Sequence, residues 1–126
     1  MTDRTDTAAV ARTFVESLDA RDWPTWLELL DSDVVYEIPQ TRERIRGRDA
    51  YLRFNQTFPG DWHLTPKVVI GDAGRAVVWS EWRVDDERAD AQVFLELGPD
   101  GRVTRVTDFW PEPYDPPARV VDVERY

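Results

Sequence analysis

The chain of 126 residues contains no cysteine and only one histidine, His63. Without cysteine it can form no disulfide bond, no thiolate metal site and no cysteine nucleophile. A single imidazole also excludes a metal site built from several histidines and any reaction that needs two of them. We therefore expect the protein to work without a metal ion or another cofactor.

Positive charge and long apolar runs are scarce as well. The 16 lysine and arginine residues face 25 aspartate and glutamate residues, which gives a formal net charge of −9. Nucleic acids and anionic membranes attract basic surfaces, so neither is an expected partner. The N-terminal stretch MTDRTDTAAVARTF is polar, and no segment has the apolar length of a signal peptide or a transmembrane helix. The expected location is therefore the cytoplasm.

The sequence does contain enough apolar residues for a core. Hydrophobic residues make up 41% of the chain and aromatic residues 12%, which favours a folded domain over a disordered chain. No internal repeat or break in composition divides the sequence. We expect one domain over 1–126. It ends in an extended, proline-rich tail over 111–126, because proline cannot join the interior of a sheet.

The first half of the sequence carries apolar residues at helical spacing. Val10, Phe14 and Leu18 recur every four residues, which is typical of an amphipathic helix. Asp6 is the expected N-cap of this helix. The patterns predict helices over 7–20, 23–30 and 48–58, and a short strand over 34–38.

After residue 60 the apolar spacing changes to every second residue, which is typical of strands. The pattern predicts strands over 64–70, 75–84, 91–97 and 102–110, joined by turns and a polar hairpin loop over 85–90. Helices followed by a meander of strands indicate an α+β domain rather than a parallel βαβ domain. We expect a cone-shaped, curved antiparallel sheet wrapped around three N-terminal helices. Such a sheet leaves a mostly apolar cavity at its open end.

Four segments in this order resemble the nuclear transport factor 2-like superfamily, which includes the SnoaL-like polyketide cyclases. The segments are VARTFVESLDARDWPTWLELLDSDVVYEIP, RGRDAYLRF, VVWSEWRV and GRVTRVTDFWPEP, and the resemblance extends over about residues 7–110. It implies the cystatin/NTF2-like α+β barrel. The superfamily hosts isomerases, cyclases, epoxide hydrolases and non-catalytic binders, so the fold does not choose among these functions.

The resemblance allows each known chemistry to be compared with the residues present. Ketosteroid isomerases of this fold use a carboxylate base, and a tyrosine and a protonated aspartate that hold the oxyanion. The corresponding positions here are Ile38, Phe14 and Val93. All three are apolar, so we do not expect ketosteroid isomerase activity.

Limonene-type epoxide hydrolases use an Asp-Arg-Asp arrangement in which the arginine holds two acid/base aspartates. Asp108 matches the last-strand aspartate of that family and Tyr36 matches its tyrosine, but Ile38 replaces its asparagine. Arg83 and Asp85 match the central pair only if their strand slips by one residue. Such a slip would move every side chain to the other face unless a bulge compensated.

SnoaL-type cyclases use an aspartate as the acid/base of an aldol closure. Asp108 is the natural candidate, with Tyr36 as a hydrogen-bond donor and His63 as a weaker helper. Alternation along the last strand places Val106, Asp108 and Trp110 on one face. A carboxylate among such neighbours would have a raised pKa, which suits proton transfer.

Each candidate also has a structural interpretation. Asp108 could accept backbone hydrogen bonds from the C-terminal tail, and Tyr36 could be a core aromatic residue with its hydroxyl at a rim. His63 could hold a loop in place, and the charged run over 83–88 could be a solvated hairpin.

We therefore expect a SnoaL-like pocket protein that binds or acts on a small apolar or aromatic molecule without a cofactor. The alternatives are a limonene-type epoxide hydrolase and a non-catalytic binding or dimerisation module. We also expect a homodimer, because Trp79 and Phe94 would lie on the sheet face opposite the pocket. The expected pocket-lining residues are Phe14, Leu18, Ile38, Trp82, Val93, Leu95, Val106 and Trp110.

Overall fold

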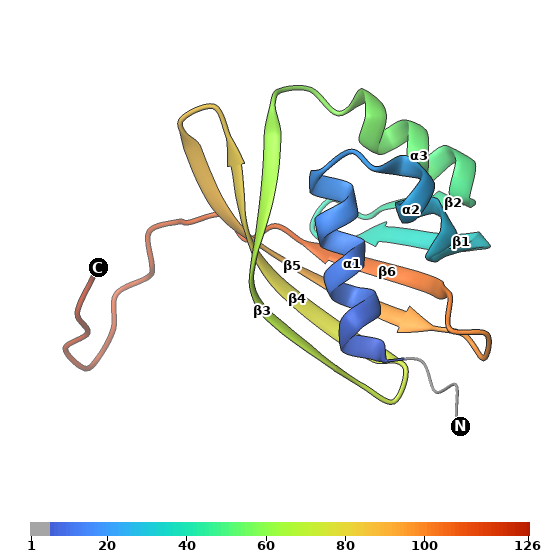
Figure 1. Ribbon diagram of the computed structural model, residues 1–126. Helices are drawn as coiled ribbons and strands as arrows, with labels where there is room; N and C mark the ends of the chain where they lie inside the picture. The colour runs from blue at the N-terminus through green and yellow to red at the C-terminus, as the bar shows by residue number, and fades with distance from the viewer. Residues whose placement is uncertain (1–5) are drawn as a thin grey trace.

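The structure is a computed structural model that describes residues 6–126. The first five residues of the polar N-terminal stretch lie outside this part. The elements are α1 (Thr7–Asp19), α2 (Trp23–Glu28), β1 (Leu30–Ile38), β2 (Glu43–Arg46), α3 (Arg48–Thr57), β3 (Trp62–Asp72), β4 (Arg75–Val84), β5 (Glu87–Leu97) and β6 (Val103–Phe109) (Figure 1). Among the described residues, no helix is long and apolar enough to cross a membrane.

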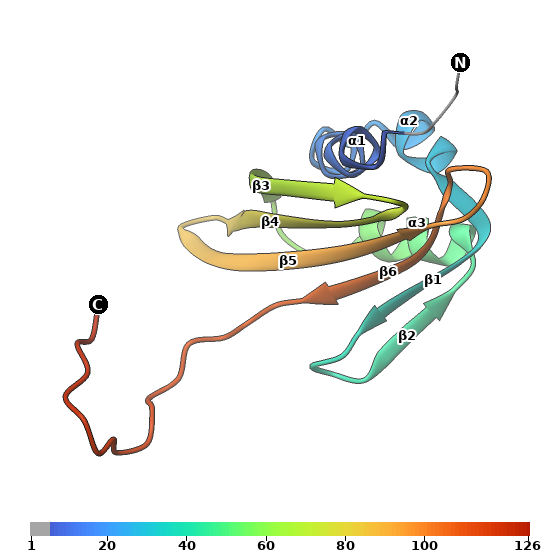
Figure 2. The same cartoon turned by 90° about the horizontal axis from the view of Figure 1, so that it is seen from below.

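The six strands form one curved sheet in the order β2-β1-β6-β5-β4-β3. The three helices lie against its concave face, with α1 over β3 and β4 and with α3 over β1 and β2 (Figure 2). This arrangement confirms the predicted α+β class. The sheet is mixed rather than wholly antiparallel, because β1 pairs with β6 in parallel. The chain passes through β2, α3, β3, β4 and β5 before β6 returns beside β1.

β1 ends at Ile38 as expected, but its start and one of its partners differ from the sequence-based expectation. The strand begins at Leu30, which was expected to lie in the second helix, and α2 ends at Glu28. The backbone N–H of Val103 donates to the Leu29 carbonyl at 2.8 Å, and Leu30 pairs with Val103. Pairing with β6 therefore overrides the local helical pattern. At its other end, β1 pairs with the unpredicted β2, a short and charged strand that carries no apolar alternation.

The β4–β5 hairpin is longer than expected because its charged residues also pair. β5 begins at Glu87 rather than at residue 91, and Glu87 pairs with Val84. Asp85 takes a positive φ of 52° in the tight turn, a conformation that aspartate tolerates better than most residues. The polar composition had predicted a loop here, but only the two residues between the strands form the turn.

Local signals at the helix starts act as expected. The backbone N–H of Ala9 donates to the Asp6 side chain at 3.2 Å, and that of Thr25 donates to Asp22 at 3.4 Å. Both aspartates thus satisfy backbone groups that lack a partner within the helix. The core lies between the helices and the sheet, with Phe14, Trp26 and Leu30 among its largest buried side chains.

Residues 111–126 form no helix or strand and extend away from the sheet (Figure 1). Most of this tail is exposed, including Tyr114 and Val121. Asp108 makes no hydrogen bond to it among the described residues. The tail therefore does not supply the structural partner that one interpretation of Asp108 required.

Gly71 allows α1 to approach the sheet closely. It lies in β3, and a Cβ atom there would come within 2.8 Å of the backbone nitrogen of Ala8 and 3.0 Å of the carbonyl carbon of Thr7. Both atoms belong to the helix backbone and cannot turn aside as a side chain could. The first turn of α1 therefore rests directly on the β3 backbone.

We predict that Gly71→Ala lowers the free energy of unfolding by about 1–3 kcal/mol, because the methyl group overfills this contact. Urea unfolding followed by tryptophan fluorescence measures the effect. Asp72→Ala is the matched control, since Asp72 is the exposed neighbour of Gly71. An alanine variant as stable as the wild type would show that α1 does not depend on this close approach.

Candidate functional site

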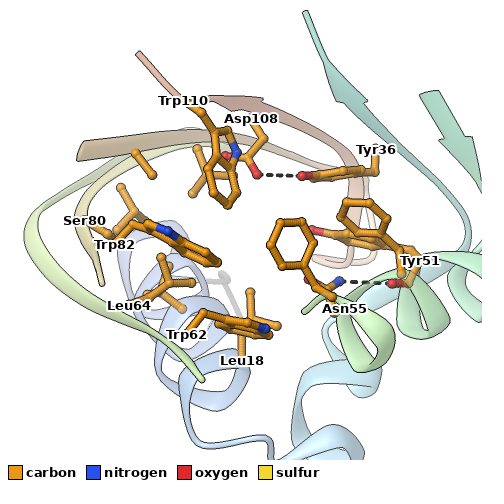
Figure 3. Close-up of a pocket in the computed structure, with 16 residues that line it drawn as sticks. Leu18, Tyr36, Tyr51, Asn55, Trp62, Leu64, Ser80, Trp82, Asp108 and Trp110 are labelled. Atoms are coloured by element: carbon orange, nitrogen blue, oxygen red, sulfur yellow. Dashed lines mark hydrogen bonds between the residues drawn. The ribbon is translucent and has the colours of Figure 1, made fainter. Parts of the chain in front are cut away.

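A cavity lies between the concave face of the sheet, the C-terminal half of α1 and α3 (Figure 3). Its interior volume that a water-sized sphere can reach is about 50 Å³. The lining residues are Val15, Leu18, Tyr36, Tyr51, Phe54, Asn55, Phe58, Trp62, Leu64, Val78, Ser80, Trp82, Ala91, Val93, Asp108 and Trp110. This set contains one carboxyl group and no lysine, arginine or histidine.

Aromatic rings form most of the wall. Trp82 stacks on Trp62 with ring centroids 5.6 Å apart and meets Trp110 edge-on at 4.5 Å. Across the cavity, Tyr36 stacks on Tyr51 at 4.4 Å. These contacts hold the rings at fixed angles. The wall of the cavity is therefore mostly aromatic and apolar.

The sheet presents these residues through simple alternation. Along β4, Val78, Ser80 and Trp82 point into the concave side, since successive side chains of a strand point to opposite faces. The register then places Val78 beside Val93, and Val93 beside Asp108. Three strands thus bring an aspartate, a serine and two tryptophans to one hollow.

Asp108 and Tyr36 form the central polar contact of the cavity. The Tyr36 hydroxyl donates a hydrogen bond to Asp108 Oδ2 at 2.6 Å (Figure 3). Burial raises the pKa of Asp108 to about 6, although the hydrogen bond from Tyr36 opposes the rise. Burial, with the nearby Asp108 charge, also raises the pKa of the Tyr36 and Tyr51 hydroxyls, so both stay protonated. The site combines a carboxyl that titrates near neutrality with two hydroxyl groups.

Two buried donors in the wall have no partner among residues 6–126. They are the indole N–H of Trp110 and the hydroxyl of Ser80. The Trp110 N–H is close enough to the Asp108 carboxyl to lower its pKa, but the geometry is too poor for a hydrogen bond. Ser80 has only 2% of its surface exposed.

Several predicted pocket residues lie where the sequence placed them. Leu18, Trp82, Val93 and Trp110 line the cavity, together with the candidate pair Tyr36 and Asp108. Ile38 is only beside it, in a shallow groove near the mouth that also contacts Phe54, Phe58 and Trp110.

The other predicted lining residues need correction. Phe14, Leu95 and Val106 are buried in the core and do not line the cavity. The Phe14 ring packs on Trp26 with centroids 5.9 Å apart. The alternation of Leu95 and Val106 and the helical spacing of Phe14 gave these side chains the inward face correctly, but neither pattern could tell the packed end of that face from the hollow end.

His63 lies outside the cavity, on β3. Its Nδ1 is 3.2 Å from Asp19 and its Nε2 is 3.2 Å from Asp61. The backbone N–H of Leu64 also donates to Asp19, at 2.9 Å. His63 thus links the end of α1 to the start of β3, in agreement with its structural interpretation, and it does not help Asp108.

Arg83 and Asp85 are also outside the cavity. Both are exposed, because alternation along β4 points Trp82 inward and Arg83 outward, while Asp85 lies in the hairpin turn. β4 and β5 pair without a bulge through this region, so the one-residue slip that would bring Arg83 inward does not occur. The Asp-Arg-Asp arrangement of the epoxide hydrolase alternative is therefore not formed.

The sequence analysis missed the contribution of α3 and of Ser80. Tyr51, Asn55 and Phe58 recur along one face of α3 and its end and line the cavity. Their spacing of three to four residues was the available signal. Ser80 occupies an inward position between Val78 and Trp82, and a polar residue at such a position was the second signal.

Comparisons with known proteins agree with this architecture. The family model described as a SnoaL-like domain matches residues 11–110. The uncharacterized protein YesE of Bacillus subtilis (strain 168) is 27% identical over 113 residues, which cover 79% of this chain and 77% of YesE.

Solved structures show the same similarity. A protein of Kribbella flavida DSM 17836, provisionally named a ketosteroid isomerase, is 47% identical with a TM-score of 0.88, covering 97% of this chain and 94% of its own. A protein of Shewanella denitrificans OS-217, provisionally named a SnoaL-like polyketide cyclase, is 14% identical with a TM-score of 0.74, covering 86% and 92%. The second similarity shows the fold alone.

We predict that Asp108→Asn changes the pH dependence of stability. The folded-state pKa of about 6 exceeds the ordinary value of 3.8, so the folded protein holds this proton more tightly than the unfolded chain does. The stability that this gives the wild type is complete below about pH 4 and is lost as the pH rises through about 6. The asparagine variant has no such group to titrate and keeps its stability. The unfolding free energy of the variant minus that of the wild type should therefore rise by up to about 3 kcal/mol from about pH 4 to about pH 8.

Urea unfolding of both proteins across this range measures the difference, with Asp85→Asn at the exposed turn as the matched control. A constant difference would contradict the raised pKa. A difference that falls with pH would identify Asp108 as a stabilised acceptor with a lowered pKa.

Proposed function

Because the chain belongs to the SnoaL-like domain family, we propose that its cavity binds a small apolar or aromatic molecule and promotes proton transfer on it without a cofactor. The observation that carries this proposal is the Asp108–Tyr36 pair at 2.6 Å inside an aromatic wall. The apolar wall supplies binding, and the pair supplies the one acid/base group in contact with the bound molecule.

The proposed chemistry follows from the protonation states of these groups. A carboxyl with a pKa of about 6 is mostly ionised at neutral pH. Because this pKa is close to the surrounding pH, the group can both take a proton and return it. Asp108 would take a proton from a carbon next to a carbonyl group and return it to another atom of the same molecule or to water. Tyr36 fixes the orientation of the carboxyl, and the apolar wall excludes water that would weaken the electrostatic interactions.

This chemistry is the first half of both an aldol cyclisation and an isomerisation. The 47% identity to the protein provisionally named a ketosteroid isomerase supports the isomerisation as a second candidate. Against it, the three positions expected to hold that family's catalytic groups are Phe14, Ile38 and Val93. Any isomerase here would therefore use Asp108 with Tyr36 or Tyr51 in place of the usual groups.

We predict that the protein accelerates exchange of the acidic C–H protons of a small ring ketone, such as 2-tetralone, with deuterated water. NMR spectroscopy measures the exchange rate, and a thermal shift measures binding. Asp108→Asn should keep binding and lower the exchange rate by about 10²- to 10⁴-fold, the usual contribution of a general base. Arg83→Ala, outside the cavity, is the control and should exchange like the wild type.

Binding of the ketone without faster exchange would favour the third reading, a non-catalytic binding module. Mass spectrometry of compounds that co-purify with the protein then becomes the direct route to the ligand. Failure of every flat apolar compound to bind would contradict the proposed function itself.

The proposal includes a homodimer formed through the outer face of the sheet. Trp79 and Phe94 are 40% and 45% exposed there, next to Ile70 at 61%. The register places Val77 of β4 between Ile70 and Phe94, so these side chains form a continuous apolar surface. Water contact over such a surface is unfavourable, and a second copy would remove it.

We predict a dimer at micromolar concentration by light scattering, and a monomer for Phe94→Arg. The arginine would place a charge at the centre of the apolar surface, where an interface leaves it without water or a partner. Arg75→Ala, an exposed change on the same face at the end of β4, should leave the dimer intact. A monomeric wild type would contradict this part of the proposal.

A further inference from the structure

Ser80 is a buried polar residue whose hydroxyl meets no hydrogen-bond partner in the part of the chain that the structure describes. It lies on β4, points into the cavity, and has 2% of its surface exposed. Its Oγ has no hydrogen-bond partner among residues 6–126. A buried hydroxyl without a partner costs about 1–3 kcal/mol of stability. An alanine at this position would avoid that cost and still fit the strand.

Other polar atoms show why this position is unusual. Ser17 is also buried, but its hydroxyl donates to the Thr13 carbonyl at 2.6 Å along its own helix. The Trp26 indole N–H has no partner either, but Trp26 does not line the cavity, and its large ring contributes to the core. Among residues 6–126, Ser80 combines a small side chain, a buried hydroxyl without a partner and a place in the cavity wall.

The sheet places Ser80 and Asp108 on its concave face, two strands apart. Ser80 pairs with Ala91 on β5, and Asp108 pairs with Val93 on the other side of β5. Two strand spacings and an offset of two residues put their Cα atoms roughly 10–12 Å apart. The rings of Trp82 and Trp110 belong to the same wall (Figure 3). The two polar groups are thus separated along one aromatic wall.

We propose that the cavity takes a flat ring compound with oxygen-bearing groups at opposite ends, one bonded to Ser80 and the other to the Asp108–Tyr36 pair. This inference rests on the proposed function and deepens it by naming the substrate class. Ser80 acts as a positioning residue. Its hydrogen bond fixes how far the ring enters, and so it sets which atom of the ring meets Asp108.

The first test uses stability without any ligand. Ser80→Ala should leave the melting temperature unchanged or raise it, because an unpartnered hydroxyl is removed from an apolar wall. Ser17→Ala is the matched control and should lower the melting temperature, since it removes a hydrogen-bonded hydroxyl. Destabilisation of the Ser80 variant as large as that of the Ser17 variant would show that Ser80 has a partner within the protein, and would overturn the proposal.

The second test uses three probes of one shape: naphthalene, 2-naphthol and 2,6-dihydroxynaphthalene. Calorimetry should show that the wild type binds the diol about five- to tenfold more tightly than the mono-ol, the value of one added hydrogen bond. In Ser80→Ala the diol should lose this advantage, while the affinity for 2-naphthol stays the same.

The outcomes separate the two proposals. If the probes bind but the diol gains nothing in the wild type, or keeps its full advantage in Ser80→Ala, the role of Ser80 is wrong and the apolar cavity of the proposed function stands. If none of the three probes binds the wild type, the proposed function fails as well.

Discussion

The concave face of the sheet both packs against the helices to form the core and lines the cavity. The rest of the structure depends on which part of the face does which. The inward side chains of β4, β5 and β6 form the core where helices cover them, as Ala76 and Leu95 do. Farther along the same strands, the inward positions are Ser80, Trp82 and Trp110, and these line the cavity. α1 crosses β3 and β4 while α3 covers β1 and β2, so the sheet curves over a space that neither helix fills. The close approach of α1 to Gly71 fixes the helix at the other end of that space.

The buried polar groups in the cavity lower the stability of the folded protein. This loss of stability distinguishes the cavity from a packing defect. A void left by imperfect packing would be lined by apolar atoms, as apolar cavities in proteins are. This one holds a carboxyl whose ionised form is disfavoured by burial and two donors without partners. Each lowers stability in the empty protein, and each becomes favourable when a bound molecule meets it. The Tyr36 hydrogen bond reduces the cost of the carboxyl without removing it, which leaves the group able to change its protonation state near neutral pH.

The sequence predicted the architecture better than the site. Period-two alternation grouped Asp108 with Trp110 on one face of the last strand, the family resemblance identified that face as inward, and the order of the elements predicted the α+β class. The sequence could not predict β2 or the early start of β1, because both depend on pairing with partners distant in the chain. It also assigned Phe14, Leu95 and Val106 to the cavity, since a periodic pattern gives the face of a residue but not the element that covers it.

Because the sequence does not show the tertiary surroundings of a residue, His63 and Arg83 were candidates for the site, although both lie outside the cavity. A single histidine and an Arg-x-Asp string attract attention as chemical groups, but their environment comes from tertiary structure. His63 lies between two aspartates at a junction of elements, and Arg83 has the outward place in a strand that pairs with β5 without a bulge. Ser80 is the opposite case, a common residue without chemical distinction in the sequence. Its burial, its inward orientation and its lack of a partner among residues 6–126 are what make it the proposed contact for a ligand, and only the folded chain shows all three.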